Sequence, residues 1–359
     1  MIPEITSPAS FLTSCTRRAI RTVSLVVGLL FSQGTLASPP VPDADVLQFD
    51  DTQLEDELVY PDWFKQSLGD LRDDLKEARD AGKISIVTYF GQKRCAYCEQ
   101  FFNTSLADAD IRNYLTRHYD LVAFDIWGID DIIDTDGTTY TERELSIHYK
   151  TNFTPSLVFY DEKGTPVFRL RGYYPPYKFG AALKYVAEKF YQTETFSEYF
   201  ARASQGEYFL LGGLTERDFF IEPPYDMTRL TGNGKPTAVF FEQGNCHACD
   251  LLHSAPLSKD DSVAEIEKMN VLQLNMWADT DLVTPQGKKT TAKDWASELN
   301  IFYAPTIVFF DPKGKEVMRV DSVTQFYRLL GVLDYVNRKG YEQDIDYQMW
   351  RVMQRDIAE

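Results

Sequence analysis

The sequence predicts an α/β protein built from two copies of one domain. The stretch GQKRCAYC at 91–98 recurs as EQGNCHAC at 242–249, and NFTPSLVFYDEKGTPVFRL at 152–170 recurs as FYAPTIVFFDPKGKEVMRV at 302–320. Self-similarity with a period of about 150 residues is the signature of a duplicated unit. Within each unit, apolar runs typical of buried strands alternate with helical stripes. The chain has 359 residues, of which 44% are apolar, so each copy can bury a core.

The first copy is expected to open with an amphipathic helix. Leu68, Leu71, Leu75 and Ala78 fall on one helical stripe, and Gly82 is a good C-terminal cap. The helix is therefore expected to end at Gly82.

The later elements of the first copy can be predicted in chain order. They are a strand at 84–90, a helix opened by the cysteine pair and carrying Phe101 and Phe102, a strand at 120–126, a turn at Gly137, a helix capped by Thr141 with Glu144, a strand at 156–160 after Pro155, a strand at 167–170, and a last helix with Phe179, Leu183, Val186 and Phe190. The order is βαβα, a ββ hairpin and α. The second copy repeats it from about Thr237.

The first residues resemble an export signal. Arg17, Arg18 and Arg21 precede the apolar run VSLVVGLLF, and Thr35 to Ala37 supply the small residues that a signal peptidase reads. That run is too short to span a bilayer comfortably, although a retained anchor is the alternative. We therefore predict a signal peptide at 1–37, an acidic linker at 38–58, a first domain at 59–203 and a second at 204–359.

The net charge and the sequence motifs limit the classes of partner and cofactor that can be expected. The formal net charge is −17, and such an acidic surface repels phosphate backbones and anionic lipid. We therefore expect no nucleic-acid partner. No other stretch of the sequence approaches about 18 apolar residues, so we expect no membrane span after signal cleavage. The sequence also lacks a nicotinamide-binding G-x-G-x-x-G motif, so no cofactor is expected.

Cysteine spacing points to redox chemistry. Cys15 leaves with the signal, and the other cysteines form two C-x-x-C pairs, Cys95 with Cys98 and Cys246 with Cys249. A disulfide across two residues closes too small a loop to stabilise a fold much. A cysteine at the first turn of a helix instead faces unpaired N–H groups and the positive dipole end, which stabilise a nucleophilic thiolate. The first cysteine of each pair is therefore the predicted nucleophile, and the second resolves the mixed disulfide.

This arrangement resembles the thioredoxin fold, with C-x-x-C at a strand-to-helix junction and Thr-Pro or Ala-Pro before a later strand. The resemblance implies a tandem duplicated thioredoxin fold, with a central mixed sheet flanked by helices. The spacing from Cys95 to Pro155, the stretch FTPSLVFYDEKG and the following RLRGYYPP are similar to the exported bacterial SoxW-like and DsbC-like branch. The resemblance also implies cis peptide bonds before Pro155 and Pro305, and substrate pairing with the backbone of Thr154 and Ala304.

The sequence departs from ordinary thioredoxins at two places. Those proteins carry Trp-Cys-Gly-Pro-Cys and a buried aspartate six residues before the first cysteine, where this chain has Tyr89 and Phe240. The proton of Cys98 must therefore pass to another acceptor. Glu99, water and the substrate thiol remain open.

A metal-binding alternative comes from the second pair. CHACDLLH places His253 one helical turn past Cys249 and His247 between the thiols, so two sulfurs and an imidazole could bind copper or zinc, as in a Sco-like chaperone. At the first pair the matching position holds Phe102. Haem attachment is excluded, because C-x-x-C-H is needed.

The preferred hypothesis is an exported protein thiol-disulfide oxidoreductase of the reductase or isomerase type. Thr154 before Pro155 resembles that branch, and Tyr97 stands where DsbA-like oxidants place histidine. The expected location is the periplasm. The expected partners are disulfide-containing exported proteins and an external, membrane-bound thiol electron donor. A third hypothesis makes the first copy catalytic and the second a degenerate partner-binding domain, because RGYYPPYKF in the first copy becomes VDSVTQF in the second.

Overall fold

A four-stranded mixed sheet lies at the centre of each copy in the computed structural model, which describes residues 47–203 and 209–358. The strand orders are β2-β1-β5-β6 and β13-β12-β8-β9. In both sheets the strand that leads into the C-x-x-C pair has one parallel neighbour and one antiparallel neighbour. The described residues belong to one compact unit, 41–359.

The first copy contains the predicted elements and some additional ones. In chain order they are α2 (Leu71–Asp80), β1 (Ser85–Gly91), α3 (Ala96–Asn103), α4 (Ala109–His118), β2 (Tyr119–Asp125), β3 (Asp131–Ile133), β4 (Thr139–Thr141), α5 (Glu142–His148), β5 (Ser156–Tyr160), β6 (Pro166–Arg171), α6 (Pro176–Ala187), η1 (Phe190–Gln192) and α7 (Phe196–Ala203). The capping box of α5 forms as predicted, because the Thr141 hydroxyl accepts from the Glu144 N–H and the Glu144 carboxylate accepts from the Thr141 N–H.

The second copy repeats this order without a counterpart of α2. Its elements are β7 (Tyr225–Asp226), η2 (Met227–Arg229), β8 (Thr237–Glu242), α9 (His247–Ser254), η3 (Pro256–Ser258), α10 (Asp260–Ile266), β9 (Asn270–Asn275), β10 (Asp281–Val283), β11 (Lys289–Thr291), α11 (Ala292–Glu298), β12 (Thr306–Phe310), β13 (Glu316–Val320), α12 (Phe326–Asn337), η4 (Gly340–Glu342) and α13 (Tyr347–Ala358). The fold class predicted from the repeat is confirmed.

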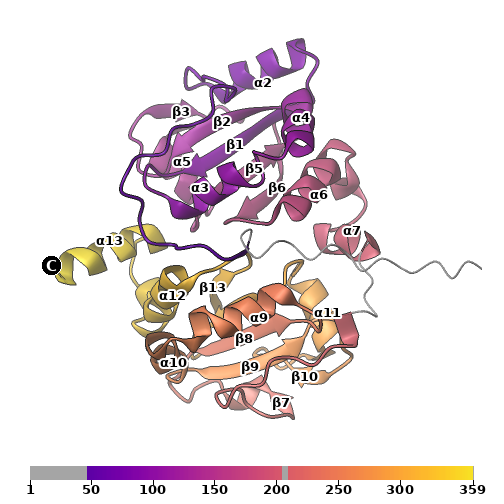
Figure 1. Ribbon diagram of the computed structural model, residues 1–359, viewed down its shortest axis with the longest axis vertical. Coiled ribbons are helices and arrows are strands. Elements are labelled where there is room, and N and C mark those ends of the chain that lie inside the picture. Colours follow the sequence, from indigo (N-terminus) through magenta and orange to yellow (C-terminus); the bar gives the residue numbers. More distant parts are fainter. Residues whose placement is uncertain (1–46, 204–208, 359) are drawn as a thin grey trace, which may run out of the picture. The chain divides into compact units, whose positions relative to one another are not determined.

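Helices cover both faces of each sheet (Figure 1). Side chains of a strand alternate between faces, so Val87 and Tyr89 join the cluster with α3, α4 and α6, while Ile86 and Phe90 join the cluster with α2 and α5. Strand β8 divides its residues in the same way between two clusters. The cysteine pair therefore follows a strand that is buried on both sides.

Two local predictions were wrong. Leu68 is fully exposed and lies before α2, because Asp70 is the N-cap and its carboxylate accepts from the Arg72 N–H at 3.0 Å. Phe190 lies in a separate 3-10 turn after Lys189, which has a left-handed backbone. The short β3–β4 hairpin around Gly137 was not predicted beyond its turn.

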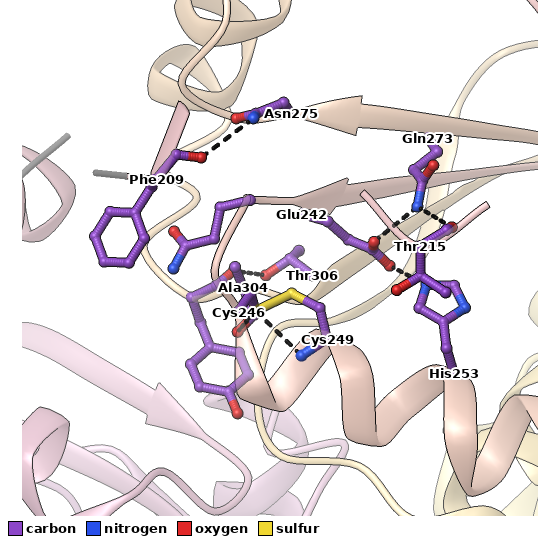
Figure 2. The surroundings of a disulfide bond; sticks show 12 residues. Phe209, Thr215, Glu242, Cys246, Cys249, His253, Gln273, Asn275, Ala304 and Thr306 are labelled. Atoms are coloured by element: carbon purple, nitrogen blue, oxygen red, sulfur yellow. Dashed lines mark hydrogen bonds and ion pairs between the residues drawn. A yellow bond between two sulfur atoms is a disulfide. The ribbon is translucent and has the colours of Figure 1, made fainter. Parts of the chain in front are cut away.

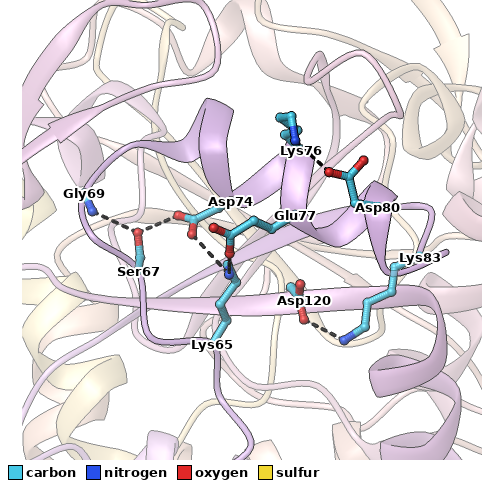
Figure 3. A network of polar contacts seen from close by, with 9 residues as sticks. All are labelled: Lys65, Ser67, Gly69, Asp74, Lys76, Glu77, Asp80, Lys83 and Asp120. Atoms are coloured by element: carbon cyan, nitrogen blue, oxygen red, sulfur yellow. Dashed lines mark hydrogen bonds and ion pairs between the residues drawn. The ribbon is translucent and has the colours of Figure 1, made fainter.

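A polar network attaches α2 to the segment before it (Figure 3). The Lys65 ammonium lies 2.5 Å from Glu77 and 3.6 Å from Asp74, and the Ser67 hydroxyl donates to Asp74 at 2.5 Å. The Lys65 N–H also donates to the Leu121 carbonyl of β2 at 2.9 Å. Burial raises the pKa of Asp74, since desolvation opposes the carboxylate. The network thus fixes the entry to the first domain at one edge of its sheet.

Residues at equivalent positions of the repeat contact each other across the two copies. The Arg171 guanidinium pairs with Asp321 at 2.8 Å, and the Val323 N–H donates to the Tyr173 carbonyl at 3.0 Å. Contact between equivalent residues is the pattern of an isologous dimer interface. The two copies therefore associate within one chain as two subunits of a symmetric dimer would.

The predicted signal peptide at 1–37 lies outside the described residues, as do residues 38–46 of the acidic linker. Residues 204–208, where the second domain was predicted to begin, also lie outside them. Within the described ranges, no helix is long and apolar enough to cross a membrane.

Candidate active site

The first cysteine pair lies at the N-terminus of α3. Cys95 is the N-cap residue, its sulfur accepts a hydrogen bond from the Cys98 N–H at 3.0 Å, and the two cysteines form a disulfide. A sulfur at an N-cap takes the place of the usual hydroxyl or carboxylate and meets the positive end of the helix. Cys98 is fully buried and Cys95 is 4% exposed, so the Cys95 sulfur is the more accessible one.

A directed chain of hydrogen bonds ends at the Cys95 sulfur. The Trp127 indole N–H donates to Gln92 Oε1 at 3.1 Å, and Gln92 Nε2 donates to the Thr154 hydroxyl oxygen at 3.0 Å. The Thr154 oxygen lies 3.3 Å from Cys95 Sγ. Because the indole can only donate, it fixes the orientation of the Gln92 amide, which leaves the Thr154 proton free to point at the sulfur. Such a donor stabilises a thiolate once the disulfide is reduced.

The second pair has the same backbone arrangement and lacks this hydroxyl (Figure 2). Cys246 caps α9, its sulfur accepts from the Cys249 N–H at 3.1 Å, and the two form a disulfide. Gln243 and Trp277 repeat the amide–indole hydrogen bond, at 2.8 Å. Ala304 replaces threonine, and its carbonyl oxygen lies 3.8 Å from Cys246 Sγ. The first site therefore has one more donor aimed at its nucleophile.

The predicted prolines lie beside both pairs. The Thr154–Pro155 and Ala304–Pro305 peptide bonds are cis, as the resemblance implied. The structure thus brings each first cysteine next to the residue before its proline. Whether Thr154 and Ala304 bind substrate stays a prediction.

A buried polar group behind the second disulfide was missed by the sequence analysis. His253 Nε2 lies 2.9 Å from Glu242 Oε1, and Gln273 Nε2 donates to Glu242 Oε2 at 2.8 Å (Figure 2). Both His253 and Glu242 are almost completely buried. In the first copy the matching positions hold Gly91, Phe102 and Ala123. Three nonpolar residues of one copy thus align with three polar residues of the other, and this difference could have revealed the buried polar group from the sequence.

This group also bears on the metal-binding alternative. His253 uses Nε2 for Glu242, and Nδ1 is buried without a hydrogen-bond partner in the described structure. Across 47–203 and 209–358, no three His, Cys, Asp or Glu side chains come together as a metal site. The convergence of the two sulfurs with His253, on which the metal-binding alternative depends, is therefore not seen among the described residues.

Several carboxyl side chains line the cavity that borders Cys95, but none occupies the position of the missing aspartate. Tyr89, at that position, is fully buried, and desolvation raises its pKa well above its ordinary value. Glu99 is exposed on α3. Glu142 lines the cavity of about 1150 Å³ that also borders Cys95, and burial raises its pKa. No motif in the sequence singled out Glu142, whose carboxyl lines this cavity.

The sequence could have revealed the Gln92–Trp127 pair. The repeat aligns Gln92 with Gln243 and Trp127 with Trp277, although pairing between Gln92 and Trp127 depends on β1 and β2 lying parallel, with Gly91 opposite Asp125. Thr154 was selected for its backbone alone. Its hydroxyl contact with Cys95 needed coordinates.

Comparison with known families identifies this arrangement. The thioredoxin-like domain matches twice, over residues 71–187 and 223–337, which together cover most of the chain. The chain belongs to the thioredoxin-like domain family. Each match contains one C-x-x-C pair, so both copies of the thioredoxin-like domain retain it.

Solved structures with related folds match about one domain of this thioredoxin-like protein. A thioredoxin-fold protein from Helicobacter pylori is 25% identical over 33% of this chain and 78% of its own, with a TM-score of 0.29. A thioredoxin from Thermus thermophilus is 26% identical over 33% of this chain and 83% of its own, with a TM-score of 0.27. A DsbH oxidoreductase is 18% identical over 37% of this chain and 92% of its own, with a TM-score of 0.25. A comparison with curated proteins finds no match.

Proposed function

We propose that this thioredoxin-like protein is a thiol-disulfide oxidoreductase of the reductase or isomerase type that acts on the disulfides of exported proteins. Cys95 and Cys246 are the proposed nucleophiles, and Cys98 and Cys249 the resolving thiols. The substrate backbone is proposed to pair beside Pro155 and Pro305, at the residues that precede them.

The observation that carries this proposal is the setting of the Cys95 sulfur. It caps a helix N-terminus, accepts the Cys98 N–H at 3.0 Å and lies 3.3 Å from the Thr154 hydroxyl. All three features stabilise a thiolate, which is the reactive species in disulfide exchange. The reaction needs no metal or nicotinamide, because the cysteine pair itself carries two electrons.

The proposed direction and location rest on the sequence. Thr154 before Pro155 is similar to the reductase and isomerase branch, including SoxW-like and DsbC-like proteins, and the first residues resemble an export signal. The proposed compartment is the periplasm, where a membrane-bound thiol donor would reduce the protein after each cycle. The first site is proposed to be the more reducing of the two.

Two measurements test this proposal. Cys98→Ser should trap substrate proteins as mixed disulfides on Cys95, since the resolving thiol is gone while the nucleophile remains. Single-site variants equilibrated against a glutathione series should place the first site well below the DsbA potential of about −120 mV. A first-site potential near that value would refute the reductase assignment. Cys98→Ser that traps no partner would refute action on protein disulfides.

One observation favours a division of roles between the copies as a second candidate. Ala304 provides no hydroxyl to Cys246, so the second pair has a weaker set of thiolate donors than the first. The second copy would then mainly bind partners. Trapped proteins found only on Cys249→Ser, and not on Cys98→Ser, would contradict this ranking.

A further inference from the structure

A cation from the second copy lies on the backbone beside the first cysteine pair. Arg328, in the first turn of α12, donates from Nη2 to the Thr154 carbonyl oxygen at 2.8 Å. Its guanidinium carbon lies 3.2 Å from the centroid of the Tyr97 ring. Arg328 is 7% exposed and Thr154 only 1% exposed, so the carbonyl next to the Cys95 sulfur is covered.

The chain holds Arg328 in place by an acidic anchor. The Asp51 carboxylate accepts from the Tyr327 N–H at 3.0 Å and from the Arg328 N–H at 2.8 Å, at a helix end whose own N-cap makes no side-chain hydrogen bond. The same carboxylate accepts from the Tyr97 hydroxyl at 3.0 Å. A negative charge at a helix N-terminus is stabilising, so this anchor positions the first turn of α12 against Tyr97.

The equivalent residue of the first copy makes a different contact. Lys178 occupies the position of Arg328 in the repeat and donates to the Phe302 carbonyl, two residues before Ala304. Its ammonium lies 4.0 Å from the centroid of the Phe200 ring. At the first site a cationic side chain thus donates to the carbonyl of the residue before the proline. At the second site the equivalent side chain donates to a carbonyl two residues earlier.

A small disulfide and an extended polypeptide would contact the surroundings of Cys95 and Thr154 in different ways. Cys95 borders a cavity of about 1150 Å³ together with Gln92 and Trp127, so a small disulfide has room to approach the sulfur. An extended polypeptide that pairs with the Thr154 backbone as an added strand needs the carbonyl that Arg328 occupies. Because Thr154 is only 1% exposed, the polypeptide can reach that carbonyl only by moving Arg328 out of its charge-assisted hydrogen bond.

We propose that Arg328 is a specificity-determining residue of the first site, which disfavours extended polypeptide disulfides relative to small disulfides at Cys95. This inference rests on the proposed function. In either reaction the Cys95 thiolate attacks one sulfur of the substrate and releases the other as a thiolate. Cys98 then attacks Cys95 Sγ, loses its proton to solvent and frees the second thiol, so two electrons pass to the substrate and the Cys95–Cys98 disulfide re-forms.

The test uses the full chain with Cys246 and Cys249 replaced by serine, so that only the first site reacts. The reduced protein is mixed with insulin, as a polypeptide disulfide, or with oxidised glutathione, and the rates are followed over a range of probe concentrations. Arg328→Met keeps the unbranched stem over Tyr97 and removes the guanidinium. It should increase kcat/KM for insulin about tenfold or more, mainly through KM, because the freed hydrogen bond is charge-assisted. The rate with oxidised glutathione should change less than about threefold.

Two further variants separate specificity from general loosening of the structure. Arg328→Lys keeps the charge and one donor and should give an intermediate preference between the two probes. Lys178→Met removes the equivalent cation of the other copy and should leave the ratio of the two rates unchanged. An unchanged ratio in both Arg328 variants, or the same increase in Lys178→Met, would overturn the inference. A parent protein that reduces neither probe would instead show that the proposed function is wrong, and the inference with it.

Discussion

The hydroxyl of Thr154 offers the sharpest test of how the first site activates its nucleophile. The oxygen lies 3.3 Å from Cys95 Sγ, and Gln92 Nε2 donates to it at 3.0 Å, so its proton is directed at the sulfur. Thr154→Ala removes this donor and installs the residue that the second copy carries at Ala304. The change is therefore one that this fold already tolerates.

The size of the effect follows from the charge of the acceptor. A hydrogen bond to a charged group contributes about 1.5–3 kcal/mol, and about 1.4 kcal/mol is a factor of ten in an equilibrium. Since Thr154 is almost completely buried, water does not readily replace the lost donor. Thr154→Ala should therefore reduce the thiolate population of Cys95 about tenfold or more.

Alkylation of the reduced protein by iodoacetamide measures this population, with Cys246 and Cys249 replaced by serine. Below neutral pH the rate at Cys95 should fall about tenfold in Thr154→Ala and recover in Thr154→Ser, which restores a hydroxyl. In the complementary single-site protein, Ala304→Thr should accelerate alkylation of Cys246. A rate in Thr154→Ala within about twofold of the parent across this pH range would show that the hydroxyl does not act on the thiolate.

Three further predictions concern buried charges. His253→Phe leaves the Glu242 carboxylate buried without its imidazole partner and should lower the free energy of unfolding by about 3 kcal/mol in urea titrations; adding Glu242→Gln should restore part of this loss, and no loss in the single variant would contradict the pairing. Burial lowers the pKa of Lys178 to about 7, so the unfolded chain binds more protons above that pH and stability should rise with pH from about 7 toward 9.5. Melting temperatures should show that Lys178→Met flattens this rise, and an equal slope in both proteins would refute it. Burial raises the pKa of Asp74 above its ordinary 3.8, so the stability of the parent should fall as pH rises through that raised value. Asp74→Asn should therefore gain stability relative to the parent from pH 4 to pH 7. A stability difference between the two proteins that stays constant over this range would argue against a raised pKa at Asp74.

Most of the fold could be predicted from local patterns in the sequence. The repeat established two similar domains, because spacings of cysteine, tryptophan and proline positions that agree to within one residue are not expected from unrelated cores. Alternating and continuous apolar runs located the central strands within one or two residues, since strand burial depends mainly on nearest neighbours. Leu68 was misplaced because helical periodicity does not show where a helix begins, whereas the Asp70 cap does.

The sequence also selected the two cysteine pairs and the residues before the prolines as candidates, since C-x-x-C and Thr-Pro are local motifs that can be read without a structure. It did not identify the partners of those groups. Trp127 and Thr154 are distant from Gln92 in the chain, and only the folded structure links these three side chains into the series of hydrogen bonds that ends at Cys95.

Only the tertiary structure decided that equivalent residues of the two copies make different contacts. The sequence shows that Arg328 and Lys178 are equivalent, yet one reaches the Thr154 carbonyl and the other a carbonyl two residues from Ala304. The physical reason is that the acceptor within reach of a long cationic side chain depends on how the opposite domain packs against it. That packing depends on the complementarity of the two surfaces and not on a periodic pattern in the sequence. The hydrogen bond between Arg328 and the Thr154 carbonyl thus joins residues that are 174 positions apart in the chain.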